Sequence, residues 1–391
     1  MKKKIIIITG SRAEYDLISE VINKFEKSKL YDLLLIFTGS HLSREFNNNK
    51  YFFKNIKVNR IKKIDIKIQK LEPKNIINSI SAGINSFSNI FRSFKPNLVI
   101  IPGDRYEMLA AAICSYFMNI RVAHLFGGDI TLGSLDDNIR HSITKFSDYH
   151  FVTSNLSKKV IEQLGEDKKN IYVVGNPGLD SMSKIKLLSK PSFSKIERII
   201  FKKKIATVVV HPDASSKRKT IKLIKEILTA LKMVKDTTFI FTKPNADTYS
   251  HEIDKRLKEF VKQNPKISSY FINLGHKKFL SILSFSDYLI GNSSAGLSEM
   301  PYFKRPTINI GDRQLGRIKP LSVIDCEDNV DSILKAIKKS QNTKFIKSIK
   351  KQSYHLGAKG GSKKIYQIIS KIDLKNVKQF KKFNLIKFNK F

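Results

Sequence analysis

The chain has 391 residues, enough for two domains of about 150–200 residues each, and its 41% apolar and 27% charged residues exclude a wholly disordered chain. Its longest aliphatic runs fall far short of the roughly 18–20 residues that span a bilayer, which excludes an integral membrane protein. The net charge of +38 would suit a nucleic-acid-binding protein, yet no zinc-finger, RNA-recognition or helix-turn-helix pattern accompanies it, so we interpret it as a solvated lysine-rich surface.

The first half of the chain alternates between predicted strands and helices. The basic start Met1–Lys4 and the aliphatic run after it resemble a signal peptide, but no small-residue cleavage pattern follows, so we expect the first buried strand there. Segments with helical periodicity, such as Ala13–Lys29 and Ile76–Phe94, predict a β-α-β order and a doubly wound parallel sheet. The predicted strands are Ile5–Thr9, Leu33–Thr38, Leu98–Pro102, Val122–Leu125, Tyr149–Val152 and Tyr172–Val174.

A second domain of the same kind is predicted after a lysine- and serine-rich stretch, about Ser183–Lys204. Helices are expected over Lys217–Val234 and Lys278–Leu283, and strands over Ala206–Val210, Thr237–Thr242, Tyr288–Ile290 and Thr307–Ile310. The predicted fold class is therefore α/β with two doubly wound, Rossmann-like domains whose strand ends border a cleft, where ligands of such sheets bind. The predicted domains are 1–184 and 185–352, with a C-terminal helix and basic tail over 353–391.

Cysteine usage and the C-terminal tail bear on location. Cys114 and Cys326 lie far apart in apolar segments, so neither a disulfide framework nor a zinc site is expected, and a reducing cytoplasm fits. The tail Lys371–Phe391 carries seven lysines and one acid with phenylalanines between them. It could dock on an anionic membrane, but we favour the packing of a last helix.

Polar residues follow two neighbouring predicted strands of the first domain. Asp104 follows the third strand, as either a catalytic carboxylate or a helix N-cap, and Asp129 follows the fourth. Asp136 and Asp137 open a helix, where the dipole favours acids, and Arg140 lies at helical spacing from both. Capping and a salt bridge are therefore the alternative, but the convergence of these residues on one sheet edge favours chemistry.

The second domain carries a candidate phosphate loop. The segment Gly291-Asn292-Ser293-Ser294-Ala295-Gly296 lies between a strand and a helix, and its small residues and hydroxyls suit a diphosphate. Glu299, one turn further, could bind the diol of a ribose; the alternative is a serine N-cap with a solvated Glu. His211 ends a strand and is either structural or in contact with ligand, and Arg12 in the first domain could meet phosphate or simply be a surface arginine.

Taken in order, these segments resemble the family of hydrolysing UDP-N-acetylglucosamine 2-epimerases, specifically its sialic and legionaminic acid branch. The resemblance covers roughly residues 4–320, and its ordered series of motifs is specific although each motif alone is weak. Non-hydrolysing relatives typically carry Glu-Glu where this chain has Asp136-Asp137 and Gly-Gly where it has Ser293-Ser294. The motifs are TGSRAEYD (9–16), GDRYE (103–107), HLFGGD (124–129), DDNIRH (136–141), VGNPG (174–178), HP (211–212), GNSSAG (291–296) and GDRQ (311–314).

The resemblance implies a GT-B-like fold, in which the last helix crosses back to the first domain, and a reaction that requires no cofactor and no metal. A base removes the proton at C2 of the sugar, the nucleoside diphosphate leaves C1 to give a 2-acetamidoglycal, and water then adds with inversion at C2. The implied catalytic residues are Asp104, Asp136, Asp137 and His211. The implied substrate-binding residues are Arg12, Arg105, Asp129, Arg140, Ser293, Ser294, Glu299 and Arg313.

The implied substrate is UDP-N-acetylglucosamine or UDP-N,N'-diacetylbacillosamine, and the implied assembly is a homodimer or homotetramer, with no nucleic acid as partner. Two positions depart from the family pattern. Phe126 stands where many relatives have Glu, so Asp129, Asp137 or a water must take over a proton transfer, or the pocket accepts a different sugar. The glycine-rich segment 354–361 is a loose version of the usual one. A GT-B glycosyltransferase with a UDP-sugar donor is the alternative function.

Overall fold

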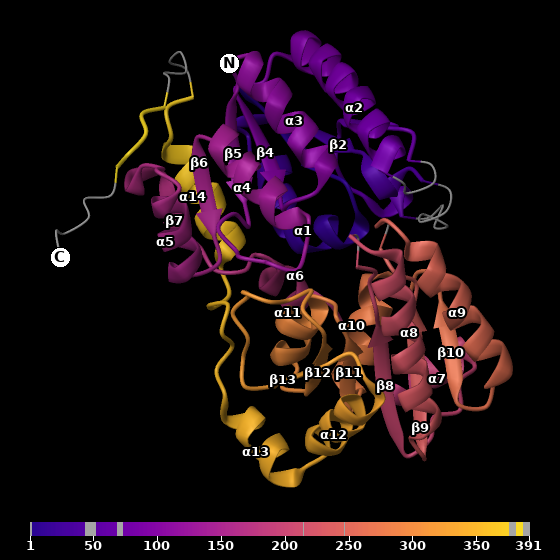
Figure 1. Ribbon diagram of the computed structural model, residues 1–391. Helices are drawn as coiled ribbons and strands as arrows, with labels where there is room; N and C mark the ends of the chain where they lie inside the picture. The colour runs from indigo at the N-terminus through magenta and orange to yellow at the C-terminus, as the bar shows by residue number, and fades with distance from the viewer. Residues whose placement is uncertain are drawn as a thin grey trace. The chain divides into compact units, whose positions relative to one another are not determined.

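The computed structural model describes residues 2–43, 52–68, 73–213, 215–245, 247–374 and 381–385, and it confirms the α/β class. The described chain forms two compact units (Figure 1). The first takes in Met1–Ile130, Asp136–Lys184 and Leu356–Phe391, and the second takes in Thr131–Leu135 and Ile185–His355. The short segment 131–135 joins the second unit, where the Leu132 N–H donates to the carbonyl of Leu315 at 3.0 Å.

Within the described ranges, the first unit has a seven-stranded parallel sheet in the order β3-β2-β1-β4-β5-β6-β7. The order reverses between β1 and β4, and ligands of doubly wound sheets bind at the carboxyl ends of strands at such a point. The strands are β1 (Lys3–Thr9), β2 (Tyr31–Phe37), β3 (Ile61–Lys63), β4 (Leu98–Pro102), β5 (Arg121–Leu125), β6 (Tyr149–Val152) and β7 (Ile171–Val173).

Helices cover both faces of this sheet, which explains the unbroken aliphatic run of β1. Successive side chains of a strand point to opposite faces, so Ile5 and Ile7 enter one core while Ile6 and Ile8 enter another. The first core is covered by α1 (Arg12–Glu26) and α14 (Gly361–Lys371), and the second by α2 (Pro73–Phe94), α3 (Tyr106–Phe117) and α4 (Asp136–Phe146). The remaining helices are α5 (Asn155–Gln163), α6 (Gly178–Lys184) and the 3₁₀ turns Gly39–His41, Phe53–Asn55 and Lys168–Asn170.

The last helix of the described chain, α14, belongs to the first unit. Ile365 and Ile369 lie in its core, and the Tyr366 hydroxyl lies 2.8 Å from the Ser28 Oγ after α1. The described part of the tail Lys371–Phe391 packs on the first unit, as we favoured, but not as a helix. The helix α14 ends at Lys371, Leu374 is buried in the first core, and residues 381–385 form no helix and bond to Glu166 and Gly165.

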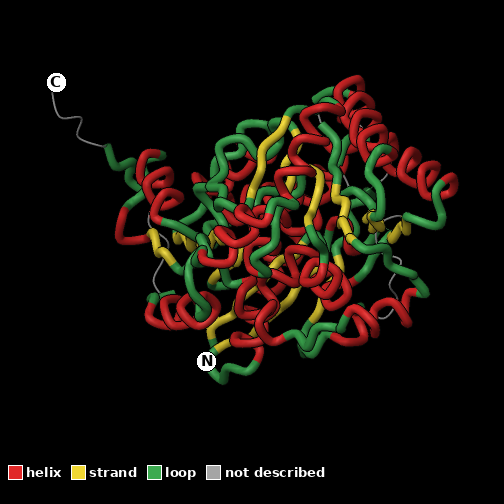
Figure 2. The backbone as a smooth tube through the Cα atoms, turned by 90° about the horizontal axis from the view of Figure 1, so that it is seen from below, coloured by secondary structure: helices red, strands yellow, loops and turns green. Residues whose placement is uncertain are grey.

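The second unit repeats the architecture with a six-stranded parallel sheet among its described residues, in the order β10-β9-β8-β11-β12-β13. Figure 2 shows the strands of the chain running between helices. The strands are β8 (Lys204–Val209), β9 (Thr237–Thr242), β10 (Ser268–Phe271), β11 (Tyr288–Gly291), β12 (Thr307–Ile310) and β13 (Val323–Cys326). The helices are α7 (Lys190–Glu197), α8 (Lys217–Lys232), α9 (Ser250–Gln263), α10 (Gly275–Phe285), α11 (Ala295–Tyr302), α12 (Val330–Ser340) and α13 (Thr343–Lys351).

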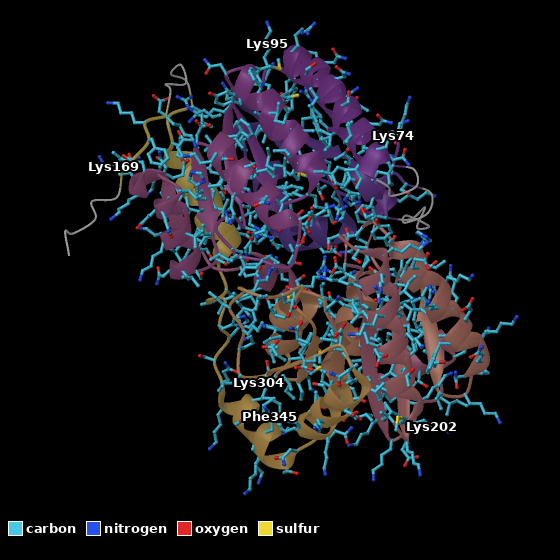
Figure 3. All side chains as sticks on the ribbon, viewed as in Figure 1. Lys74, Lys95, Lys169, Lys202, Lys304 and Phe345 are labelled. Atoms are coloured by element: carbon cyan, nitrogen blue, oxygen red, sulfur yellow. The ribbon has the colours of Figure 1, made fainter. Side chains whose placement is uncertain are left out.

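Lysine side chains are spread over both units and point outward. The labelled lysines of Figure 3, which come from widely separated parts of the chain, are all exposed: Lys74, Lys95, Lys169, Lys202 and Lys304. Over the described residues, every helix is too short or too polar to cross a membrane.

Candidate active site

Asp104 lies directly after β4 and is held by a buried arginine. Its Oδ2 accepts hydrogen bonds from Nε of Arg140, at 3.1 Å, and from Nη2 of the same guanidinium. The N-cap of α3 is Arg105, and it makes no side-chain capping bond. The N-cap position is thus occupied by Arg105 rather than by Asp104, and Arg140 orients the Asp104 carboxylate at the carboxyl end of β4.

Arg140 organises further acidic groups around itself. Its Nη1 donates to the backbone oxygen of Asp129 at 2.8 Å and to Oδ1 of Asp137 at 3.1 Å. Its side chain is only 1% exposed, and burial opposes its charge, but Asp104, Asp129 and Asp137 outweigh burial and raise the pKa of Arg140. The structure thus brings together Asp104, Asp129, Asp137 and Arg140 of the predicted site, and it places Asp136 in the first turn of the same helix.

The turn that carries Asp104 is fixed by His124 on β5. Nε2 of His124 lies 2.7 Å from the Gly103 carbonyl, so this nitrogen carries the hydrogen, while Nδ1 lies 3.1 Å from the Thr144 hydroxyl. Burial lowers the pKa of His124 to about 3, which keeps the ring neutral. His124 therefore positions the turn without carrying charge.

Two buried glutamates beside this turn escaped the sequence analysis as members of the site. Glu107 is fully buried, and its Oε1 accepts from Nε of Arg105 at 2.9 Å. Glu14 accepts from the N–H of Gly10 at 2.7 Å, and burial, followed by the charge of Glu107, raises the pKa of Glu14 to about 8. A Cβ on Gly10 would overlap the Glu107 carboxylate, so this glycine lets the two acids meet.

Both arginines near this pair have partners within the unit. Arg105, predicted to bind substrate, is committed to Glu107, and Arg12 forms an ion pair with Asp16 at 3.8 Å and lies 5.3 Å from the Phe52 ring centre. The signal for Glu14 was present in the sequence, since it stands three residues after Ser11 in a capping box. Nothing local in the sequence marks Glu107 as its neighbour.

In the second unit, the loop after β11 is locked to His211. Oδ1 of Asn292 accepts from the His211 N–H at 2.7 Å, and Nδ2 of Asn292 donates to the His211 carbonyl at 2.9 Å. The buried Gln314 donates to the Asn292 carbonyl at 2.9 Å, and Nδ1 of His211 accepts from the Asn245 N–H at 3.2 Å. These bonds fix His211 and the loop relative to each other. Asn245, Asn292 and Gln314 are therefore positioning residues, and the sequence predicted no role for them.

The loop itself has the geometry of an exposed helix N-terminus. Ser294 is exposed and occupies the N-cap position of α11, as the alternative expected, but its side chain makes no capping bond; the hydroxyl of the buried Ser293 accepts from the Ala295 N–H at 3.3 Å instead. A Cβ on Gly296 would overlap Thr307, so the glycine lets α11 approach β12 closely. Glu299 accepts a hydrogen bond from Ser298, and burial raises the pKa of Glu299. The first four N–H groups of α11 already have acceptors in the Ser293 hydroxyl and the carbonyls of Ser293 and Ser294, so this terminus offers an anion its helix dipole and the exposed Ser294 hydroxyl.

The other predicted residue of this unit, Arg313, forms an ion pair with Asp247. Its Nη2 lies 3.4 Å from Oδ2 of Asp247, which orients the guanidinium. Among the described residues, no group of three or more His, Cys, Asp and Glu side chains could hold a metal ion.

Comparisons with known proteins show to which family the chain is similar. The family model described as UDP-N-acetylglucosamine 2-epimerase matches residues 23–370. A Campylobacter jejuni protein named GDP/UDP-N,N'-diacetylbacillosamine 2-epimerase (hydrolyzing) is 37% identical over 345 residues, covering 88% of this chain and 89% of its own. A Legionella pneumophila protein named UDP-N,N'-diacetylbacillosamine 2-epimerase (hydrolyzing) is 32% identical, covering 96% and 97%.

A solved structure shows the same fold. The Neisseria meningitidis UDP-GlcNAc 2-epimerase bound to UDP-GlcNAc superposes with a TM-score of 0.78 at 17% identity, covering 94% of this chain and all of that one (100%). The family model alone spans most of the chain, and the two relatives extend the match nearly from end to end. The chain belongs to the UDP-N-acetylglucosamine 2-epimerase family.

Proposed function

We propose that the chain is a hydrolysing nucleotide-sugar 2-epimerase that converts a UDP-linked 2-acetamido sugar and water into UDP and the free 2-epimeric sugar. The observation that carries the proposal is the shared guanidinium of Arg140, which holds the carboxylates of Asp104 and Asp137 together at the end of β4. A pair of fixed carboxylates suits proton transfer to and from a single carbon.

The reaction needs a proton removed from C2 and a proton returned to its opposite face. In our proposal Asp104 and Asp137 divide these two transfers, with Asp136 and Asp129 as further candidates. When the C2 proton leaves, the electrons of the C2–H bond form the C1–C2 double bond, and UDP departs with the electron pair of the broken C1–O bond. Protonation of the glycal at C2 and addition of the water oxygen at C1 complete the hydrolysis with inversion at C2.

The second unit supplies the nucleotide contacts in this proposal. Ser293, Ser294 and the N-terminus of α11 hold the diphosphate, Glu299 binds the ribose diol, and Arg313 offers a positive charge to phosphate. His211 assists the departure of the diphosphate, since its ring is fixed through Asn245 and its backbone through Asn292.

Two sugars remain candidates for the 2-acetamido substrate. The relatives named for UDP-N,N'-diacetylbacillosamine are 37% and 32% identical, against 27% for a Neisseria meningitidis UDP-N-acetylglucosamine 2-epimerase. An Escherichia coli polysialic acid biosynthesis protein is 36% identical. These names favour an epimerase over a glycosyltransferase. We further propose that the enzyme supplies an amino sugar for sialic or legionaminic acid synthesis and works as a homodimer or homotetramer.

Proton NMR in deuterated water tests the proposal. The chain is incubated with UDP-N-acetylglucosamine and, separately, with UDP-N,N'-diacetylbacillosamine, and an Asp104→Asn variant serves as control. We expect free UDP and a manno-configured sugar with deuterium at C2 from one of them, and neither product from the variant. Release of UDP only when an acceptor sugar is added would instead support the glycosyltransferase.

A further inference from the structure

A short C-terminal segment, residues 381–385, binds to the first unit at two points. Nζ of Lys381 donates to Oε2 of Glu166 at 2.7 Å and to the Ser147 carbonyl at 2.6 Å. The Asn384 N–H donates to the Gly165 carbonyl at 2.9 Å. In Figure 1 this yellow segment lies on the side of the unit that carries α5 and β7. The segment lies beyond residue 370, where the match to the family model ends.

The acceptor of Lys381 is a buried carboxylate. Glu166 is 4% exposed, and its other partners are Nζ of Lys145, 2.6 Å from Oε1, and Nε2 of His150, 3.1 Å from Oε2. Burial would raise the pKa of Glu166, but His150, Lys381 and Lys145 together lower it to about 2. The carboxylate is therefore ionised, and a buried charge of this kind depends on its partners.

The packing of Phe383 adds a contact that does not involve this charge. Gly165 has φ +82°, and a Cβ there would lie 2.6 Å from the Phe383 ring, so the ring occupies the place of a side chain. Nζ of Lys145 lies 4.9 Å from the centre of the same ring. The segment is thus fitted to this corner of the unit by shape as well as by charge.

Two of the residues that the segment contacts, Lys145 and Ser147, lie at the end of helix α4, while Gly165 and Glu166 follow α5. Lys145 is in the last turn of α4 and also donates to the Leu164 carbonyl at 3.0 Å. Ser147 follows the helix and donates through Oγ to the Ile143 carbonyl at 2.7 Å. Asp137 in the first turn of α4 and Arg140 one turn later precede Ser147 along the helix by roughly 10–15 Å, at 1.5 Å per residue. Because a helix moves as a rigid rod, its position at one end sets the position of the other.

We propose that residues 381–385 form a tether that positions helix α4, with Lys381 as the positioning residue for Asp137 and Arg140. The inference rests on the proposed function only for the catalytic roles of Asp137 and Arg140, and the positioning of α4 does not depend on it. The tether contacts no reacting atom; it fixes the end of the rod that presents them. Thr144 of the same helix also bonds to His124, which holds the turn of Asp104, so all three groups depend on the seating of α4.

The test compares Lys381→Met with Lys382→Met, a matched control at an exposed neighbouring lysine. We expect Lys381→Met to lower kcat by about threefold to thirtyfold with KM unchanged and to speed amide hydrogen exchange over residues 136–147. Lys381→Arg should restore both kcat and the slower exchange. Phe383→Ala, which leaves the charges in place, should act in the same direction and serves if Lys381→Met fails to fold.

Each outcome decides the matter. If Lys381→Met matches Lys382→Met in both exchange and kcat, the tether is overturned. Faster exchange with unchanged kcat also overturns the positioning role and leaves only a contribution to stability. If the unaltered chain releases no UDP from either sugar nucleotide while exchange over α4 still responds to Lys381→Met and not to the control, the proposed function fails and the seating of α4 by the tether stands.

Discussion

Nε2 of His124 donates a hydrogen bond to the carbonyl oxygen of Gly103 at 2.7 Å, and this bond joins β5 to the turn from which Asp104 projects. We predict that His124→Phe, which fills similar space without the donor, leaves this carbonyl and the Thr144 hydroxyl without their buried partner. The free energy of unfolding should fall by about 1–3 kcal/mol, measured by urea denaturation, and kcat should fall with it. His124→Gln, which can donate to the same carbonyl, should recover part of both; equal loss in the two variants would contradict the assignment.

Asp104→Asn should lower kcat by roughly 10²–10⁴ while UDP affinity stays nearly constant. The amide keeps the shape of the carboxylate but cannot accept the proton, and a group that moves protons adds little to binding of the ground state. Turnover is measured by UDP release and affinity by calorimetry, with the exposed Asp65→Asn as control. Activity near that of the unaltered chain would remove Asp104 from the mechanism.

The Glu14 carboxyl should make stability depend on pH. Its pKa of about 8 in the folded state lies above the ordinary 4.5, so the folded chain holds a proton there that the unfolded chain releases. This contribution is fully present below pH 4.5 and is lost as pH rises toward 8. Glu14→Gln should therefore be stabilised relative to the unaltered chain at pH 8 more than at pH 5, as measured by thermal unfolding.

Comparison of these two chains at each pH removes the effect of the buried histidines. Burial lowers the pKa of His41 and of His124 to about 3, so both cost stability as pH falls below 6.5, but they do so equally in both chains. A difference between Glu14→Gln and the unaltered chain that stays constant from pH 5 to pH 8 would show that Glu14 titrates normally.

The double variant Ser294→Ala, Glu299→Ala should weaken UDP binding by about tenfold or more. It removes the exposed hydroxyl at the start of α11 and the carboxylate proposed for the ribose, and a hydrogen bond to a charged group is worth about 1.5–3 kcal/mol. Ser348→Ala, on the exposed face of α13, is the control. Unchanged affinity for UDP, by calorimetry, would mean that the diphosphate binds elsewhere.

Phe126→Glu should change the preference between the two candidate sugars. The residue has φ +67° and packs against the first core, so the new carboxylate occupies a fixed, strained position rather than a mobile one. The ratio of kcat/KM for the two UDP-sugars measures the effect, and Phe126→Leu, which stays apolar, should leave the ratio closer to its original value. The same ratio in all three chains would exclude residue 126 from sugar selection.

The central strands could be predicted from the sequence because both of their faces are buried. Leu98–Pro102 and Thr237–Thr242 were predicted with the bounds that the structure gives. The strands that were missed, β3, β10 and β13, lie at sheet edges and carry only three or four residues, with partly exposed patterns such as that of Ile61–Lys63. Such a strand depends on its neighbour, which local periodicity does not reveal.

The site was predictable only as far as its motifs are local. Asp137 and Arg140 are one helical turn apart, so their contact follows from spacing. Glu14 lies near Glu107, and His211 bonds to Asn292, although each pair comes from segments about 80 or more residues apart in sequence. The separation of His211 and Asn292 is 81 residues. These contacts exist only once the parallel strands are aligned, and no residue type in either segment signals the other.

The burial of Ile365 and Ile369 from α14 in the same core as Ile5 has a consequence for biosynthesis. During synthesis on the ribosome, Ile185–His355 emerges in full before Leu356. The second unit can therefore fold while the first unit still lacks α14, the helix that covers part of its core. Until its last helix emerges, the first unit presents Ile5, Phe25 and their neighbours to water. We expect chaperones to bind the chain during this interval. They should be released when α14 packs and buries these apolar residues.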